Sequence, residues 1–94
     1  MSDDTFHATS VVFCGHGLLL RGAAGMGKSD LALRLIEAGG VLVADDRTLL
    51  KMENGALYAE APKAIAGLLE IRGLGLRRVP HLPRARMDIC LELV

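Results

Sequence analysis

The chain has 94 residues, 51% of them hydrophobic, so it fits one domain with enough apolar material for a core. Eleven Lys and Arg residues balance eleven Asp and Glu residues, and only 3% of residues are aromatic, which argues against a nucleic-acid surface that would need rings for base stacking. Residues 63–94 hold six basic side chains against three acids, which fits either an anion-facing edge or an ordinary solvated one.

The N-terminus and the cysteines indicate the compartment. The first ten residues, MSDDTFHATS, lack the basic-then-apolar order of a signal peptide, and no apolar run has the length of a membrane span. Cys14 and Cys90 stand in apolar runs without metal-ligand spacing, so we expect reduced, buried thiols. These features predict a soluble protein of the cytoplasm that contacts no membrane.

The first half of the chain predicts three strands and one helix. Residues 5–14 are rich in β-branched and aromatic side chains, and residues 18–21, LLLR, form a short apolar run after a glycine turn. Residues 28–38 repeat apolar side chains at helical spacing until a Gly-Gly pair ends the pattern. Residues 41–44, VLVA, then predict a buried strand that ends in two aspartates.

The second half predicts a hairpin and further strands. Asn54-Gly55 is a turn pair that tolerates positive φ, and a two-residue loop there pairs Met52 with Leu57. A short helical turn should follow, then a strand at 69–72, a glycine-rich loop and a final strand at 86–94. Because an unprotected apolar edge invites aggregation, we expect the natural protein to continue or a partner subunit to cover this strand.

A phosphate-binding loop stands between the second strand and the helix. The pattern G-x-x-x-x-G-K-[ST] is satisfied in its required strand–loop–helix context, which makes a chance match improbable. Glycines let successive N–H groups point inward toward an anion, and the helix start adds the positive end of its dipole. A lysine then reaches the outer phosphates and a hydroxyl reaches Mg²⁺. The residues are Gly22, Ala23, Ala24, Gly25, Met26, Gly27, Lys28 and Ser29.

Acidic side chains complete the predicted site. Asp45 and Asp46 lie one helix after the loop, so strand, loop, helix and strand form a βαβ unit that brings both acids to the loop's end of the sheet. A carboxylate there can hold the metal through water or take a proton from an attacking hydroxyl. A turn with a capping aspartate is the simpler alternative. Asp30, in the helix's first turn, equally fits stabilisation of the helix dipole.

Glu70 and Arg72 are two residues apart on a predicted strand, so both should project from one face. An acid and a guanidinium together fit metal contact and phosphate clamping. An exposed surface ion pair would give the same pattern. From the residues alone, the two interpretations stay equally open.

The segments GAAGMGKSDLALRLIEAGGVLVADD and LLEIRGLG resemble the HPr kinase/phosphorylase family, in its short alphaproteobacterial form without the usual N-terminal domain. The loop, ADD at its short distance and EIRGLG in order are together specific, and the resemblance runs from about His7 to the end. It implies an α/β P-loop fold of the phosphoenolpyruvate carboxykinase-like type with a mixed sheet. It also implies one catalytic domain over residues 1–94, incomplete at its C-terminus.

The resemblance also implies roles for individual residues. Asp45 matches the family's catalytic aspartate, the base toward a serine hydroxyl in one direction and the acid in the other. His7, which by itself would pass for a strand residue, matches a histidine near the active site, and Arg72 matches the arginine of EIRG. The metal would lie among Ser29, Asp46 and Glu70.

The implied activity is ATP-dependent phosphorylation of a serine of the phosphocarrier HPr, with the reverse phosphorolysis yielding pyrophosphate. The implied cofactors are ATP or pyrophosphate and Mg²⁺, and the implied assembly is a homo-oligomer, a hexamer in the family. The absent C-terminal segment, which in the family contacts HPr, makes phosphorolysis the less secure direction. The residues alone leave two alternatives: a small-molecule kinase or nucleotide hydrolase, and a nucleotide-sensing module that presents Arg72, Arg77 and Arg78 to a partner.

Overall fold

A computed structural model describes residues 4–23 and 25–94 as a mixed α/β fold. Among these residues, no helix is long and apolar enough to cross a membrane. In chain order the elements are β1 Asp4–Phe13, β2 His16–Arg21, α1 Lys28–Glu37, β3 Val41–Ala44, β4 Arg47–Glu53, β5 Ala56–Glu60, the 3₁₀ turn η1 Lys63–Ile65, β6 Leu68–Ile71, β7 Gly75–Arg78, β8 Arg84–Arg86 and β9 Ile89–Glu92.

The long strand β1 is the centre of the main sheet, whose path runs β8-β5-β4-β1-β2-β9 with β3 also paired to β1. Both β2 and β3 are antiparallel to β1, so they run parallel to each other and end at the same edge. The predicted βαβ unit is therefore confirmed, with β1 inserted between its two strands. This arrangement brings the segment after β2 and the segment after β3 to one place.

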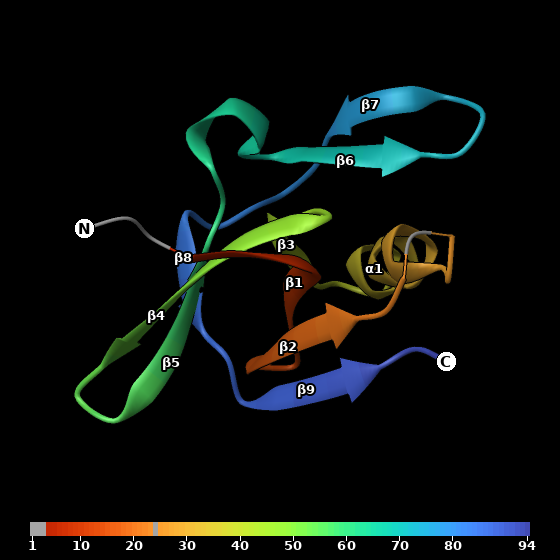
Figure 1. The fold of residues 1–94 in the computed structure, drawn as a ribbon. Coiled ribbons are helices and arrows are strands. Elements are labelled where there is room, and N and C mark those ends of the chain that lie inside the picture. Colours follow the sequence, from red (N-terminus) through yellow and green to blue (C-terminus); the bar gives the residue numbers. More distant parts are fainter. Residues whose placement is uncertain (1–3, 24) are drawn as a thin grey trace.

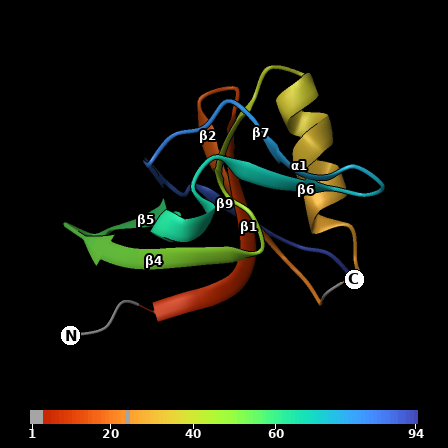
Figure 2. The same ribbon diagram turned by 90° about the horizontal axis from the view of Figure 1, so that it is seen from above.

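Both faces of the β2–β3 region are buried, which explains the unbroken apolar runs of these strands. Leu20 and Leu42 pack with Ala32 of α1 in one cluster, whereas Leu19 and Val43 pack with residues around β5 in a second. Neighbouring strand residues point to opposite faces, so each strand supplies both clusters. Figures 1 and 2 show the result: α1 on one side of these strands and the β4–β5 hairpin extending away on the other.

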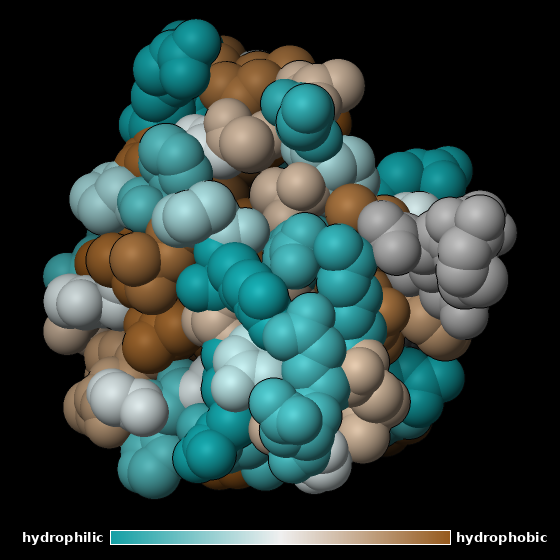
Figure 3. Space-filling view, turned by 90° about the vertical axis from the view of Figure 1, so that its left-hand side faces the viewer, coloured by the Kyte–Doolittle hydropathy of each residue, from teal (hydrophilic) through white to brown (hydrophobic). Residues whose placement is uncertain are grey.

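The predicted hairpin and its register are confirmed. Asn54 and Gly55 have φ of 51° and 79°, and Met52 pairs with Leu57. The surface at this end of the molecule is mixed: Figure 3 shows a band of hydrophilic side chains with hydrophobic ones scattered beside it. The hairpin also carries a charge pair, in which Lys51 Nζ lies 3.3 Å from Glu60 Oε1.

Three expectations for the fold were wrong. Cys14 and Cys90 are exposed, because Cys14 occupies the turn after β1 with φ of 53° and Cys90 lies on the outer strand β9. The glycine-rich segment after β6 turns at 72–74 and returns as β7, so a second, two-stranded sheet forms. The expected strand at 86–94 is divided into β8 and β9 around residues 87–88.

Asp88 lies at this division and joins the start of β9 to the start of β2. Its Oδ2 accepts the N–H of Gly17 at 3.0 Å, and its own N–H donates to the Gly17 carbonyl at 2.8 Å. The Gly17 N–H holds the pKa of Asp88 below its ordinary value, and the nearby Arg86 guanidinium lowers it further. The ionised carboxylate is therefore favoured by the folded state.

We expect the free energy of unfolding of the Asp88→Asn variant to fall less on acidification than that of the wild type. Because folding lowers the pKa of Asp88, its contribution is present above the ordinary Asp value of about 3.9 and disappears as the pH falls through the lower folded-state value. Urea unfolding of both proteins from about pH 2 to 7 measures this. A difference in unfolding free energy that stays constant with pH would contradict it.

Candidate functional site

The phosphate loop leads directly from β2 into α1. Gly25 and Gly27 have φ of 85° and 93°, a left-handed conformation that glycine adopts without strain, and Gly27 is the residue before the helix. Gly27, the cap residue, has no side chain to bond the N–H groups of the first turn, which lie at the positive end of the helix dipole. The described part of the loop thus has the backbone of an anion site. Ala24 lies outside the described residues.

The first glycine of the loop is held against β9. Gly22 has φ of 152°, and a Cβ there would lie 2.9 Å from the carbonyl oxygen of Leu93. The N–H of Leu93 also donates to the carbonyl of Arg21 at 2.7 Å. The entry to the loop is therefore fixed by the segment that follows β9, and a larger residue at position 22 would collide with it.

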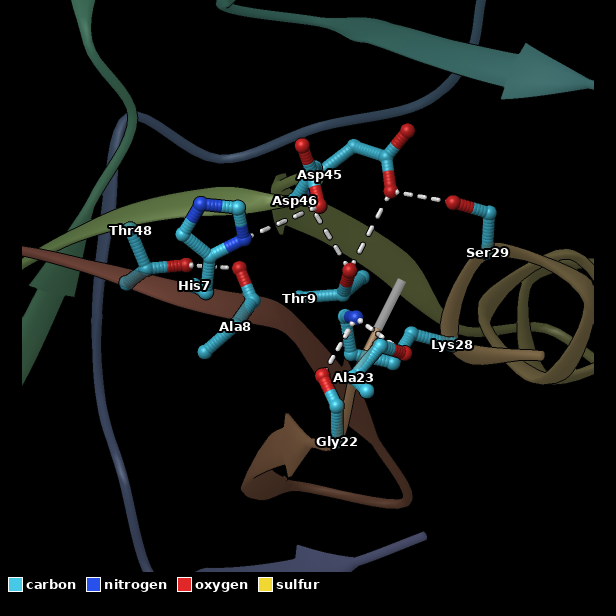
Figure 4. Close-up of polar contacts among 10 residues, drawn as sticks. All are labelled: His7, Ala8, Thr9, Gly22, Ala23, Lys28, Ser29, Asp45, Asp46 and Thr48. Atoms are coloured by element: carbon cyan, nitrogen blue, oxygen red, sulfur yellow. Dashed lines mark hydrogen bonds and ion pairs between the residues drawn. The ribbon is translucent and has the colours of Figure 1, made fainter. Parts of the chain in front are cut away.

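Lys28 is buried, with only 5% of its surface exposed. Its Nζ donates to the carbonyl of Gly22 at 2.7 Å and to that of Ala23 at 3.3 Å (Figure 4). The ammonium group is thus held inside the curve of the loop. A buried lysine needs such partners, and negatively charged phosphate oxygens would satisfy it more fully than neutral carbonyls.

Asp45 follows β3 and is almost entirely enclosed, with 8% of its surface exposed. Its Oδ1 accepts the hydroxyls of Ser29 at 2.7 Å and Thr9 at 3.2 Å, and its Oδ2 accepts the N–H of Glu70 at 3.0 Å. Three donors on one carboxylate fix its orientation. Asp45 therefore connects β1, the start of α1 and β6.

Asp46 has the opposite character, because 54% of its side chain is exposed. Its φ of 67° is a left-handed conformation, which costs a residue other than glycine on the order of 1–3 kcal/mol. Its Oδ1 lies 3.9 Å from Nδ1 of His7, a pair that is charged when the histidine is protonated. Figure 4 shows the two side chains facing each other beside the enclosed Asp45.

A pocket of about 280 Å³ collects most of the predicted site residues. The loop and the first turn of α1 supply part of the lining, and the segment that follows β3, together with β6 and the residue after it, supplies acids and an arginine. Arg72 lies just after β6 rather than on it, yet it reaches the same pocket as Glu70. The lining is Gly25, Gly27, Lys28, Ser29, Asp30, Asp46, Glu70 and Arg72.

Other predicted residues lie outside this lining. Gly22, Ala23 and Met26 belong to the loop without lining the pocket, and Met26 is 42% exposed. A smaller pocket of about 210 Å³ shares Asp46 and Glu70 with the first, and its lining also includes Asp45. His7 lines neither pocket, and among the site residues it lies beside Asp46.

The donor set fits Mg²⁺ held jointly with phosphate. Within the described residues, no group of three or more His, Cys, Asp or Glu side chains is placed to hold a metal alone. The oxygens of Ser29, Asp46 and Glu70 line one pocket, and Mg²⁺ is bound typically by one or two carboxylates together with substrate phosphates and water. Ser29 and the Glu70 carboxylate would hold the ion at the loop when a nucleotide supplies the remaining ligands.

Sequence reasoning missed Thr9, a fully buried residue of β1 that contacts both acids. A threonine in a strand has no feature that separates it from other β-branched residues. Only the pairing of β1 with β3 reveals its place, because that pairing is a tertiary fact.

Three comparisons with known proteins agree with this geometry. The family model for the HPr Serine kinase C-terminal domain matches residues 1–83. The HPr kinase/phosphorylase of Caldicellulosiruptor bescii is 44% identical over 97 residues, which cover 95% of this chain and 31% of that protein. The HPr kinase/phosphorylase of Clostridium tetani is 45% identical over 76 residues, 81% of this chain and 25% of that protein.

A solved structure of the Hpr(Ser) kinase/phosphatase from Coxiella burnetii matches with a TM-score of 0.89 and 35% identity, covering 97% of this chain and 59% of that one. This similarity confirms the predicted fold class. The chain spans between a quarter and a third of the length of the two curated relatives. The boundaries of the predicted domain and the predicted site residues stay predictions.

Proposed function

The chain belongs to the HPr kinase/phosphorylase family, and on this premise we propose that it transfers the γ-phosphoryl group of ATP to a serine of an HPr-like phosphocarrier protein. The observation that carries the proposal is one pocket whose lining includes Lys28, the start of α1 and Asp46. Such a pocket would surround a phosphate with a cation, helix N–H groups and a carboxylate. HPr is proposed as the acceptor because the relatives are named as kinases of HPr.

The loop side of the pocket would bind the nucleotide. Helix N–H groups would hold the phosphates, Lys28 would neutralise charge that develops on the outer ones, and Arg72, which lines the same pocket, would clamp them. Mg²⁺, held by Ser29 and Glu70 together with the phosphates, would supply further charge neutralisation and leave Asp46 free. Pyrophosphate offers the same charges and would fit the same cradle.

Asp46 is better suited than Asp45 to be the base. We predicted Asp45 from the resemblance, but three hydrogen bonds occupy its carboxylate and leave it 8% exposed. Asp46 lies open to both pockets, and its Oδ1 is 3.9 Å from Nδ1 of His7. A general base must reach the proton that it removes, and this geometry favours the exposed carboxylate.

In the forward direction, Asp46 would take the proton of the serine hydroxyl while the serine oxygen bonds to the γ-phosphorus. The bond from that phosphorus to the β–γ bridging oxygen breaks, and ADP leaves. In phosphorolysis, a phosphate oxygen would bond to the phosphorus of phosphoserine, and Asp46 would return a proton to the departing serine oxygen. Pyrophosphate and serine are then the products.

The smaller pocket adjoins the first at Asp46, so the acceptor serine could approach Asp46 through the smaller pocket while the nucleotide occupies the first. In-line transfer requires the attacking oxygen to stand opposite the leaving group. The smaller pocket meets the first at Asp46 and Glu70 and carries the apolar side chains Ile65, Leu68 and Leu76. A polypeptide segment could rest there with its serine directed at the shared carboxylates.

The proposal extends to assembly and compartment. Ile89 and Leu91 of β9 are 45% and 40% exposed at an edge of the sheet, which supports an oligomer that covers them. The family resemblance implies a hexamer. The proposed place of action is the cytoplasm.

We expect the chain with Mg·ATP to add one phosphoryl group to a purified HPr-like carrier. Intact-mass measurement of the carrier detects the transfer, and a carrier with its acceptor serine replaced by alanine is the control. Release of inorganic phosphate without any gain in the mass of the carrier would contradict the proposal. That result would favour a nucleotide hydrolase.

A further inference from the structure

We propose that Thr9 is a positioning residue that sets the two acids in their separate roles, an inference that rests on the proposed function. Thr9 is completely buried in β1 and does not line either pocket. Figure 4 shows its hydroxyl between Asp45 and Asp46. It can therefore act only through the two carboxylate residues.

The hydrogen bonds of this hydroxyl have a fixed direction. Thr9 Oγ1 donates its single hydrogen to Oδ1 of Asp45 at 3.2 Å and accepts the backbone N–H of Asp46 at 3.0 Å. The Asp46 N–H can only donate, and a carboxylate can only accept. One hydroxyl thus holds the side chain of the first acid and the backbone of the second.

The neighbouring residue of β1 holds the other side of Asp46. The N–H of Ala8 donates to the Asp46 carbonyl at 3.1 Å, so the residue is fastened at both its N–H and its carbonyl. Asp46 has φ of 67°, a conformation that needs such support. The left-handed turn directs Asp46 into the pocket while Asp45 stays enclosed.

The same hydroxyl also links the acids to the phosphate loop. Ser29, at the start of α1, donates to the same oxygen of Asp45 that accepts the Thr9 hydroxyl. Thr9, Asp45 and Ser29 therefore connect β1, β3 and α1 in one chain of contacts. Loss of the Thr9 hydroxyl would let the base and the loop shift relative to each other.

Thr9→Val tests this role because it keeps the shape of the side chain and removes its hydroxyl. We expect kcat for phosphoryl transfer to fall about 10- to 100-fold with the KM for ATP little changed, since misplaced supporting groups cost about this much. Thr9→Ser, which keeps the hydroxyl, should restore kcat. Thr48→Val is the matched control: Thr48 is equally buried, and its hydroxyl bonds Ser10 and the Ala8 carbonyl instead of the acids.

Hydrogen exchange of the Asp46 amide gives a second readout that does not depend on transfer. The amide should be protected in the wild type, Thr9→Ser and Thr48→Val, and should exchange at least tenfold faster in Thr9→Val. Thermal unfolding confirms that each variant is folded. If Thr9→Val does not fold, Thr9→Ala takes its place in both measurements.

Wild-type kcat in Thr9→Val, or a kcat equally reduced in Thr9→Ser and Thr48→Val, would overturn the positioning role. Unchanged protection of the Asp46 amide in Thr9→Val would overturn it as well. Absence of transfer by the wild type would overturn the proposed function instead. The amide exchange would then still decide whether Thr9 holds the acid turn.

Discussion

Asp46→Asn is expected to slow phosphoryl transfer on the order of 10²–10⁴-fold, the range associated with loss of a general base. The amide keeps the size of the side chain but cannot take the serine proton. The KM for ATP should change far less, because the loop glycines, Lys28 and Ser29 remain in place. Steady-state transfer to the carrier, with ATP binding measured separately by calorimetry, resolves the two quantities.

Asp45→Asn is the matched comparison, and we expect it to affect stability and nucleotide binding more than the rate of proton transfer. Its carboxylate accepts two hydroxyls on one oxygen and the Glu70 N–H on the other, so an amide must turn its NH₂ toward one of these donors. We expect a lower melting temperature and a higher KM for Mg·ATP, because Ser29 and β6 lose their common anchor. A catalytic loss confined to kcat in Asp45→Asn, together with normal kcat in Asp46→Asn, would restore the original assignment of the base to Asp45.

The second large effect is expected for Lys28→Met. Methionine keeps an unbranched apolar stem in the buried site but removes the charge that the loop encloses. Removing one electrostatic stabiliser of this kind costs about 10²–10³-fold in kcat, and a weaker affinity for ATP should accompany it. The transfer assay and the nucleotide titration used for Asp46→Asn measure both effects.

Lys63→Met controls for the loss of a positive charge alone. Lys63 is exposed on η1 and lines neither pocket, so its replacement should leave transfer and ATP binding near wild type. Equal losses in the two lysine variants would mean that net charge, and not contact with phosphate, controls the reaction. Normal turnover by Lys28→Met would contradict the assignment of the phosphate loop.

Local patterns were sufficient to predict the elements nearest the site. The LLLR strand, the amphipathic helix and the VLVA strand each carry their signal within a few consecutive residues, and so does the Asn54-Gly55 turn. Because crossover units have a fixed sense, these elements also predicted that the loop and the acids would meet. The shared pocket that contains Lys28 and Asp46 agrees with that expectation.

Features that depend on distant pairing were not predicted. The different exposures of Asp45 and Asp46 follow from the left-handed turn that Ala8 and Thr9 hold, and two adjacent aspartates in a sequence give no sign of it. The position of Cys90 likewise depends on β9 taking the edge beside β2. Apolar neighbours in sequence suggested burial, but sheet order determined exposure.

The pairing of β9 with β2 has a consequence for the timing of folding. Gly17 and Asp88, which join these strands, are 71 positions apart, and closing so long a loop makes a parallel pairing intrinsically slow. During synthesis, the β1–β2 hairpin and α1 emerge from the ribosome well before β9 does. The loop between β2 and α1 therefore gains its last backbone support, at Gly22, only after almost all of these residues have been translated.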